Sequence, residues 1–197
     1  MDEIKSAAEI AMEKMEKLGR ATDEERLEWK YVPEGRKLAG KHIKQGINLV
    51  AELSQYKDNI REYIIQGVAE VLISNISLPD NDSAKRNNRR AMEGLKVVKS
   101  DKAGVENVYS KIRRIFDHYA GEGAQQREQA YQSLKAEFEA KMKQALQQQQ
   151  LGTFAGMKLD VERQPQFQEE WHRAQVQLDS QYLKLLDEYK QELSAIS

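Results

Sequence analysis

The stretch DNIREYIIQGVAEVLISNISL, residues 58–78, is the most apolar part of the chain and decides its fold. A helix that is apolar nearly all round usually lies at the centre of a core. We therefore predict that 58–78 is a central helix against which the other segments pack. The run contains Glu70 and Asn75, and it is too short and too polar to span a bilayer. The apolar side chains that set this pattern are Ile60, Ile64, Ile65, Val68, Val71, Leu72, Ile73 and Ile76.

The composition of the chain is typical of long amphipathic helices. Of its 197 residues, 40% are hydrophobic and 32% are charged, a larger charged share than an average globular domain has. Amphipathic helices have this balance because each buries one stripe and leaves its other faces in water. Three prolines and few β-branched runs disfavour a sheet. We predict an all-α protein with more than about 65% of its residues in helices, well above the usual third.

Helical spacing also precedes the central run. Residues 2–19 carry an apolar stripe and predict an N-terminal amphipathic helix. Thr22 and Glu25 form a capping-box pattern, which predicts a second, short helix that stops before Pro33. Since proline suits the first turn of a helix, a third helix is expected from Pro33 to about Tyr56.

Two further helices are predicted between the central run and residue 120. The polar run at 80–83 ends the central helix and caps a helix over 83–100. After a break near residues 100–101, a second apolar stripe covers 105–119 and is closed by glycines at 121 and 123. We therefore divide the chain into an N-terminal amphipathic helix at 1–21, a compact helical core at 22–120 and a C-terminal long helical hairpin at 122–197.

The last third of the chain predicts a long, antiparallel, coiled-coil-like hairpin. Residues 124–151 and 165–196 each carry an unbroken stripe, and the second stripe repeats every eleven residues. At 1.5 Å per residue, the two helices would be about 40 and 48 Å long. The apolar link at 152–165 is expected to fold over the end of the hairpin, although a short strand that pairs with another chain is an alternative.

A two-helix hairpin hides only part of each apolar stripe. We therefore expect the hairpin either to dock on the core or to form a homodimer, and we favour the dimer, because contiguous exposed apolar area usually marks an interface. Another helical protein is the alternative partner. The side chains proposed for this oligomer interface are Trp171, Leu178, Tyr182, Leu185, Tyr189 and Leu193.

Basic residues gather in the stretch SAKRNNRRAM, residues 83–92, and again near residue 113. The favoured interpretation is a solvated helix face whose cations pair with acidic helices of the same chain. The alternatives are a phosphate-binding surface over 83–114 and a docking patch for an acidic protein. No aromatic residue is interleaved with these arginines and the net charge is −1, so nucleic acid is disfavoured. The candidate contact residues are Lys85, Arg86, Arg89, Arg90, Arg113 and Arg114.

No catalytic, cofactor or metal site is expected from the sequence. Glu169 and His172 have the spacing of di-metal helical bundles, but neither His42 nor His118 has a glutamate three residues before it. The absence of cysteine excludes disulfides and fits a reducing compartment, which favours the cytoplasm. The aromatic residues Trp29, Tyr31 and Trp171 are expected to anchor the core.

Two stretches near the ends of the chain resemble an uncharacterised family of small helical bacterial proteins. They are EIKSAAEIAMEKMEKLG, residues 3–19, and QYLKLLDEYKQEL, residues 181–193. The resemblance implies no activity and assigns no residue a role. From the residues themselves we expect a non-catalytic interaction or scaffolding protein that self-associates, with a nucleic-acid-associated protein as the alternative.

Overall fold

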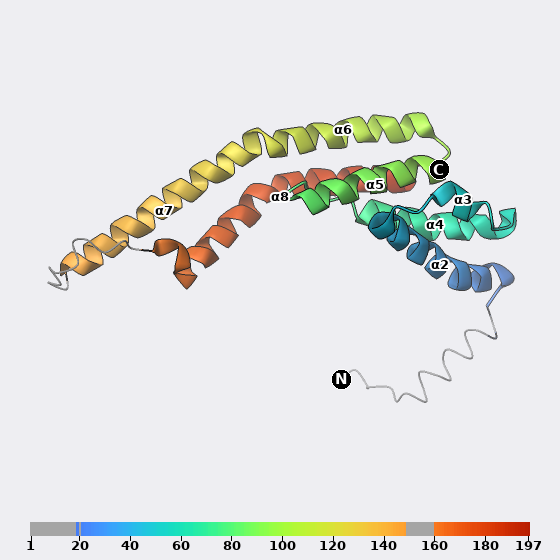
Figure 1. Ribbon diagram of the computed structural model, residues 1–197, viewed down its shortest axis with the longest axis horizontal. Helices are drawn as coiled ribbons and strands as arrows, with labels where there is room; N and C mark the ends of the chain where they lie inside the picture. Colours follow the sequence, from blue (N-terminus) through green and yellow to red (C-terminus); the bar gives the residue numbers. More distant parts are fainter. Residues whose placement is uncertain (1–18, 20, 149–159) are drawn as a thin grey trace.

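The computed structural model of the chain describes residues 19, 21–148 and 160–197 and is built from helices (Figure 1). Helices make up 85% of the structure, and no strand occurs among the described residues, so the predicted all-α class is confirmed. The N-terminal helix predicted at 2–19 lies outside the described residues, apart from Gly19. In chain order the elements are α2 (Asp23–Gln45), α3 (Leu49–Leu53), α4 (Asp58–Ser74), α5 (Asp82–Val98), α6 (Lys102–Ala120), α7 (Glu122–Gln148), the 3₁₀ turn η1 (Val161–Arg163) and α8 (Pro165–Ala195).

Helix α4 is the central helix that the apolar run predicts. Its Ile64, Val68 and Leu72 are fully buried, and it contacts α2, α3, α5 and α8. The helix ends at Ser74 and not at residue 78, because the Asn75 side chain donates a hydrogen bond of 2.8 Å to the Val71 carbonyl. The residues that follow are not helical, but Ile76 and Leu78 remain in the core.

Helix α2 runs through Pro33, so the prediction of two helices that meet at this proline is wrong. The predicted capping box is present, with Thr22 Oγ1 accepting from the Glu25 amide at 3.2 Å. An interior proline costs a helix about 3 kcal/mol because it removes a hydrogen bond and crowds the preceding turn. Val32 and Gly35, on either side of this turn, are buried, so tertiary packing holds the helix together.

The expected extension of this helix to Tyr56 is also wrong. Gly46 ends α2 in the left-handed region at a φ of 73°, which favours glycine. Asn48 then caps the short helix α3, because its side chain accepts from the amides of Val50 and Ala51. Because Gly46 ends one helix and Asn48 caps the next, the segment from Pro33 to Tyr56 is divided between α2 and α3.

The predicted break near residues 100–101 is confirmed. Helix α5 begins after the N-cap Asn81, and α6 begins after the N-cap Asp101, whose side chain accepts from the Gly104 amide at 2.9 Å. The turn between the two helices also holds the end of the described chain. The amides of Ser100 and Asp101 donate to the Ser197 oxygen at 2.9 and 3.2 Å.

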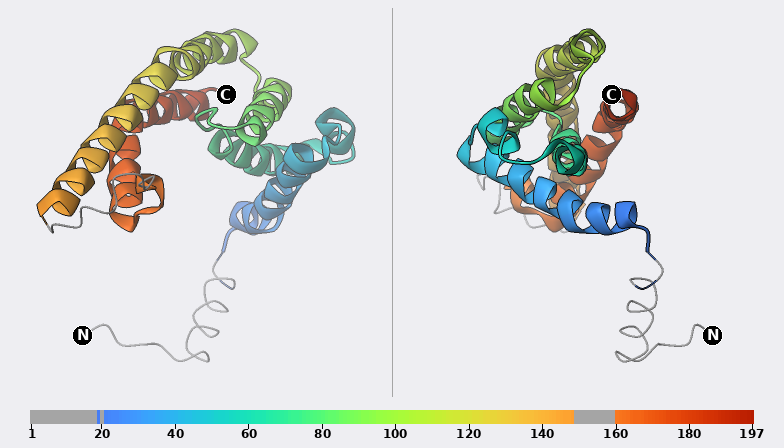
Figure 2. Two further views of the ribbon diagram at one scale, coloured as in Figure 1. Left: turned by 60° about the vertical axis from the view of Figure 1, so that its left-hand side comes forward. Right: turned by 90° about the vertical axis from the view of Figure 1, so that its right-hand side faces the viewer.

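Helices α6 and α7 are separated by Gly121 and together curve over α8, as Figure 2 shows from two sides. Helices α7 and α8 are the two antiparallel arms of the predicted hairpin (Figure 1). The C-terminal half of α8 lies on the core, where it packs against α6 and α4 and buries Leu186 and Leu193. The hairpin therefore docks on the core, one of the two outcomes expected from its apolar stripe. Residues 152–159 of the link lie outside the described residues.

Candidate functional site

A hollow of about 940 Å³ lies between α6 and α8 and reaches the start of α7. We call it the α6–α8 groove. Its apolar lining comes from one flank of α8, from Ile115 of α6 and from Ala130 of α7, and its charged lining comes from α6. The lining residues used below are Lys111, Arg114, Ile115, His118, Leu178, Tyr182, Leu185 and Tyr189.

The apolar flank of α8 is incompletely covered in this groove. Leu185 is 41% exposed, and Leu178, Tyr182 and Tyr189 are each partly exposed. These four residues belong to the stripe that the sequence predicts as an oligomer interface, so the structure places them together on one accessible flank. They contact α6 along one edge and leave the other edge to solvent.

Two other residues of that predicted stripe pack against other helices of the same chain. Leu193 is fully buried in the core. Trp171 lies beside Tyr131 of α7, with ring centroids 5.1 Å apart, in an edge-to-face cluster that also holds Phe167. The sequence also places Leu185 in the buried row, whereas Leu186 is the core residue with 1% exposure. Leu193 is therefore not available to a partner in this structure, whereas Trp171 is partly exposed and packs one side of its ring against α7.

Polar contacts fix the two ends of the groove. His118 Nδ1 lies 2.8 Å from the Tyr182 hydroxyl, and its Nε2 lies 2.8 Å from Glu122 Oε2. At the other end, Lys111 Nζ pairs with Glu192 Oε2 at 2.6 Å and lies 5.3 Å from the centre of the Tyr189 ring. The His118–Tyr182 and Lys111–Glu192 contacts connect α6 to α8 at the two ends of the groove, and Glu122 connects His118 to α7.

A largely buried ion pair also joins α7 to α8. Arg127 Nη1 lies 3.4 Å from Asp179 Oδ1, and the two side chains are 18% and 23% exposed. The guanidinium also lies 3.8 Å from the centre of the Tyr119 ring and donates to the Tyr119 carbonyl at 2.9 Å. Burial, with the nearby Asp179 carboxylate, raises the pKa of the Tyr119 hydroxyl. The cluster joins the bend at Gly121 to α8.

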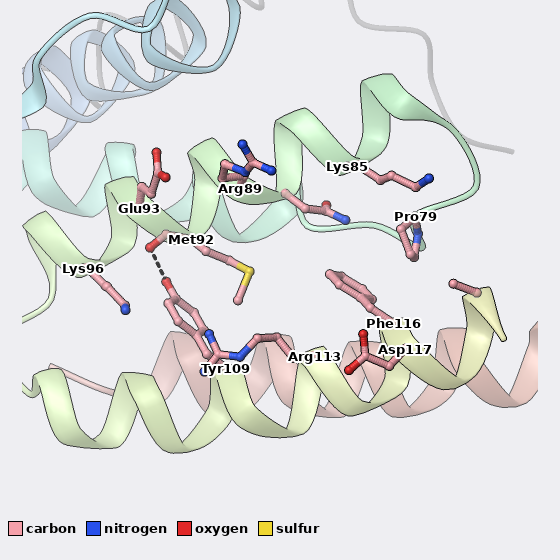
Figure 3. Close-up of a pocket in the computed structure, with 12 residues that line it drawn as sticks. Pro79, Lys85, Arg89, Met92, Glu93, Lys96, Tyr109, Arg113, Phe116 and Asp117 are labelled. Atoms are coloured by element: carbon pink, nitrogen blue, oxygen red, sulfur yellow. Dashed lines mark hydrogen bonds between the residues drawn. The ribbon is translucent and has the colours of Figure 1, made fainter.

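A second hollow, of about 420 Å³, lies between α5 and α6 (Figure 3). We call it the α5–α6 groove. Figure 3 shows Met92 and Phe116 pointing into it from opposite helices, with the Tyr109 ring beside Met92. Pro79 and Ala120 complete the apolar lining at one end. Charged side chains surround it: Lys85, Arg89, Glu93, Lys96, Arg113 and Asp117.

The polar groups inside the α5–α6 groove are bonded within the protein. The Tyr109 hydroxyl donates to the Met92 carbonyl at 2.7 Å, and burial raises the pKa of this hydroxyl. The buried Asn88 amide accepts from the Ser77 amide at 2.9 Å and donates to the Ser77 carbonyl at 2.7 Å. Among the described residues, no buried side-chain nitrogen or oxygen lacks a hydrogen-bond partner.

Comparison with known proteins identifies a family. The model of a family of unknown function, DUF6657, matches residues 50–195 of the chain. The chain belongs to DUF6657. The match covers the segments from α4 to α8, and so includes both grooves, and it contains the stretch 181–193 that resembles uncharacterised helical proteins. No curated protein and no solved structure shows a significant match to the chain.

The structure brings together three of the six basic residues singled out in this DUF6657 sequence, because Lys85, Arg89 and Arg113 all line the α5–α6 groove, and the other three do not line it. Lys85 lies 3.5 Å from Asp82, and Arg113 pairs with Glu106. Arg90 turns inward and donates to the carbonyls of Ile43 and Lys44 at the C-terminal end of α2. The remaining three, Arg86, Arg89 and Arg114, have no ion pair among the described residues, and Arg114 lies apart from the others in the α6–α8 groove.

The other sequence candidates of the DUF6657 chain are dispersed. Glu169 pairs with Arg173 at 2.6 Å. His172 lies beside Val176 and Leu183, on the flank of α8 that faces away from the α6–α8 groove. Within the described ranges, no group of three or more His, Asp or Glu side chains could hold a metal ion. No described helix is long and apolar enough to cross a membrane. Trp29, expected in the core, is 47% exposed because α2 presents this face to solvent, whereas Tyr31 packs against the core.

The residues that sequence reasoning missed are those that shape the grooves. Met92 belongs to the apolar stripe predicted over 83–100, whereas Tyr109 and Phe116 each follow a residue of the 105–119 stripe and are not part of it. Their spacing gives no indication that α5 and α6 diverge after the turn at residues 99–101 and leave a hollow between them. The spacing of His118 and Glu122 by four residues is the single signal that could have indicated a polar contact at the end of the α6–α8 groove.

Proposed function

We propose that this DUF6657 protein is a non-catalytic interaction or scaffolding protein whose α6–α8 groove receives a helix from another chain. The partner is a second copy of the protein, which gives a homodimer, or another helical protein. A cytoplasmic location, favoured by the cysteine-free sequence, is part of this proposal. The partly exposed apolar flank of α8 in the groove carries the proposal.

Physical chemistry supports a helix as the occupant of this groove. A helix that docks in an apolar groove presents side chains at intervals of three, four and seven residues. Leu178 and Leu185 are seven residues apart, and Tyr182 and Tyr189 repeat that spacing along the same flank. Fully burying one large apolar side chain is worth about 1.5–3 kcal/mol, so covering this row favours association.

The charges around the groove support an acidic residue on the docking helix. Arg114 lines the groove and has no ion pair among the described residues, whereas Lys111 is paired with Glu192. A guanidinium binds a carboxylate through two parallel hydrogen bonds, which add geometric specificity to the contact. A carboxylate on the partner helix, placed beside its apolar row, would therefore fix the register of docking.

Sedimentation equilibrium at micromolar concentration tests self-association. The full chain is expected to have twice the monomer mass, and the double variant Leu178→Asp/Leu185→Asp is expected to have the monomer mass with its helix content retained. The matched control is Val176→Asp/Leu183→Asp, which adds the same charges to the opposite, exposed flank of α8. The control should remain dimeric. A full chain that is monomeric throughout, or a control that dissociates equally, would contradict self-association through this groove.

Nucleic-acid binding through residues 83–114 remains the less favoured proposal. Arg90 is engaged at the end of α2, and Lys85 and Arg113 each lie beside an acid. The cations that would neutralise phosphates are therefore few and are divided between α5, which carries Arg86 and Arg89, and α6, which carries Arg114. No specific observation favours this function over protein binding.

A further inference from the structure

The α5–α6 groove combines an apolar interior with a charged rim in which cations outnumber acids. The interior is formed by Met92, Tyr109, Phe116, Pro79 and Ala120, and its volume of about 420 Å³ lies within the range of small-molecule sites. From this combination we propose that the groove binds a single-chain amphiphile with a carboxylate head, a fatty acid. This site is separate from the α6–α8 groove, and the proposal goes beyond protein association.

The occupant is a hydrocarbon because the interior offers no free hydrogen-bonding group. The Tyr109 hydroxyl and both polar atoms of the Asn88 side chain are engaged within the protein. A polar ligand would lose its bonds to water in this interior and gain none in return, whereas an acyl chain loses nothing. Met92 is flexible and polarizable, so it can adapt to a mobile chain.

The head group is an anion because two cations at one end of the groove share one carboxylate. Lys96 Nζ lies 2.6 Å from Glu106 Oε2, and Arg113 Nη2 pairs with Glu106 Oε1. The groove as a whole is lined by four cations, Lys85, Arg89, Lys96 and Arg113, and by two acids, Glu93 and Asp117, so with Glu106 counted its net charge is +1. Lys96 and Arg113 are each about half exposed, so both can turn part of their donor capacity toward a second carboxylate.

The shape of the hollow favours a thin chain over a helix. The turn at residues 99–101 joins α5 to α6, so the two helices converge toward Lys96 and Tyr109 (Figure 3). A helix with its side chains is about 10–12 Å across and would have to force them apart. An acyl chain instead lies lengthwise between Met92 and Phe116, with its head beside Arg113.

Isothermal titration calorimetry tests how much the carboxylate head contributes to affinity. The full-length protein is titrated with dodecanoate below its critical micelle concentration, and dodecanol serves as the uncharged comparison. Dodecanoate is expected to bind. Arg113→Met should weaken it about tenfold, because one charge-assisted hydrogen bond is lost, and should leave dodecanol unchanged. The matched control is Arg114→Met, which alters the next residue of α6 on the side of the other groove. It should bind dodecanoate as the unaltered chain does.

The position of the bound acyl chain is tested by NMR of the Met92 methyl group, whose resonance is assigned with the Met92→Leu variant. Dodecanoate should shift this resonance, and Met92→Asp should abolish binding while circular dichroism shows the helices intact. Absence of dodecanoate binding up to millimolar concentration, or equal affinities for Arg113→Met and Arg114→Met, would overturn the proposal. Binding that leaves the Met92 methyl unmoved would also overturn it, because the ligand would then lie elsewhere.

Discussion

Gly35 of α2 and Gly67 of α4 face each other where the two helices cross in backbone contact. A Cβ atom on Gly35 would lie 2.1 Å from the Ile64 carbonyl oxygen, and a Cβ atom on Gly67 would lie 2.1 Å from the Val32 carbonyl oxygen. A Cβ atom and a nonbonded carbonyl oxygen do not approach so closely, and neither carbonyl can move without disturbing its own helix. This crossing attaches α2, with its interior proline, to the central helix.

Gly67→Ala should therefore destabilise the protein strongly. Overpacking a core costs about 1–3 kcal/mol, and a clash with backbone should lie at or above the upper end of that range. The matched control is Gly40→Ala in α2, where nothing lies within 4 Å of the added methyl group. The control should gain up to about 1 kcal/mol from its better helix propensity. Urea unfolding of both variants checks the prediction, and a Gly67→Ala protein as stable as the unaltered chain would refute the crossing.

Arg90 should contribute to stability, whereas its neighbour Arg89 should not. Arg90 donates to the carbonyls of Ile43 and Lys44 at the C-terminal end of α2, where a cation also complements the helix dipole. Arg90→Met should lower the free energy of unfolding by about 1.5–3 kcal/mol, the usual range for a hydrogen bond to a charged group. Arg89→Met, at an exposed position, should change it by less than about 0.5 kcal/mol. Thermal unfolding of the two variants separates these outcomes, and equal losses would argue against the assigned role.

Glu106 should titrate below the ordinary range for glutamate. Hydrogen bonds from Lys96 and Arg113 hold the pKa of this carboxyl below its usual value of 4.5. Because the pKa is lower in the folded state, the stabilisation is present above about pH 4.5 and is lost as the pH falls through the folded pKa. NMR titration of the Glu106 side chain measures the midpoint directly. Lys96→Met should raise that midpoint toward the ordinary value, and an unchanged midpoint would show that the pairing is absent in solution.

Residues 83–92 should not bind nucleic acid at physiological salt. Within the part of the chain that the structure describes, Arg86 and Arg89 are the α5 cations with neither an ion pair nor a hydrogen bond from the side chain, too few to release many counterions. Fluorescence anisotropy with labelled single-stranded and duplex oligonucleotides, in about 0.15 M salt, should show no complex. A tight complex that weakens with added salt and is lost in Arg86→Glu/Arg89→Glu would show that this expectation is wrong. Arg90 is kept in that variant because it stabilises α2.

The sequence predicts the helices well where their apolar spacing and caps are local. The run at 58–78 predicts the central α4, Thr22 and Glu25 predict the start of α2, and the break near residue 101 is found at the Asp101 cap. Pro33 is interpreted incorrectly because the packing that keeps α2 continuous comes from Gly67, which lies 34 positions further along the chain. Local propensity contains no information about that contact.

The grooves could be predicted only in part. The exposed flank of α8 follows from the stripe that holds Leu178 and Tyr182. The choice between Leu185 and Leu186 as the buried residue depends instead on where α6 lies, and a one-residue difference rotates a helical position by about 100°. The α5–α6 groove depends on the angle between two helices, which no spacing within either helix specifies.

The central claim, that the α6–α8 groove is where a second copy docks, is tested most directly by a spin label in the groove. Because the chain has no cysteine, Gln181→Cys introduces a unique labelling site at the groove, and Val50→Cys, 59% exposed on α3, provides a distant control. Pulsed dipolar spectroscopy of the Gln181→Cys protein should show a defined distance between labels on two copies, which disappears in the Leu178→Asp/Leu185→Asp background. A label at residue 181 that shows no intermolecular coupling at micromolar concentration would contradict the account.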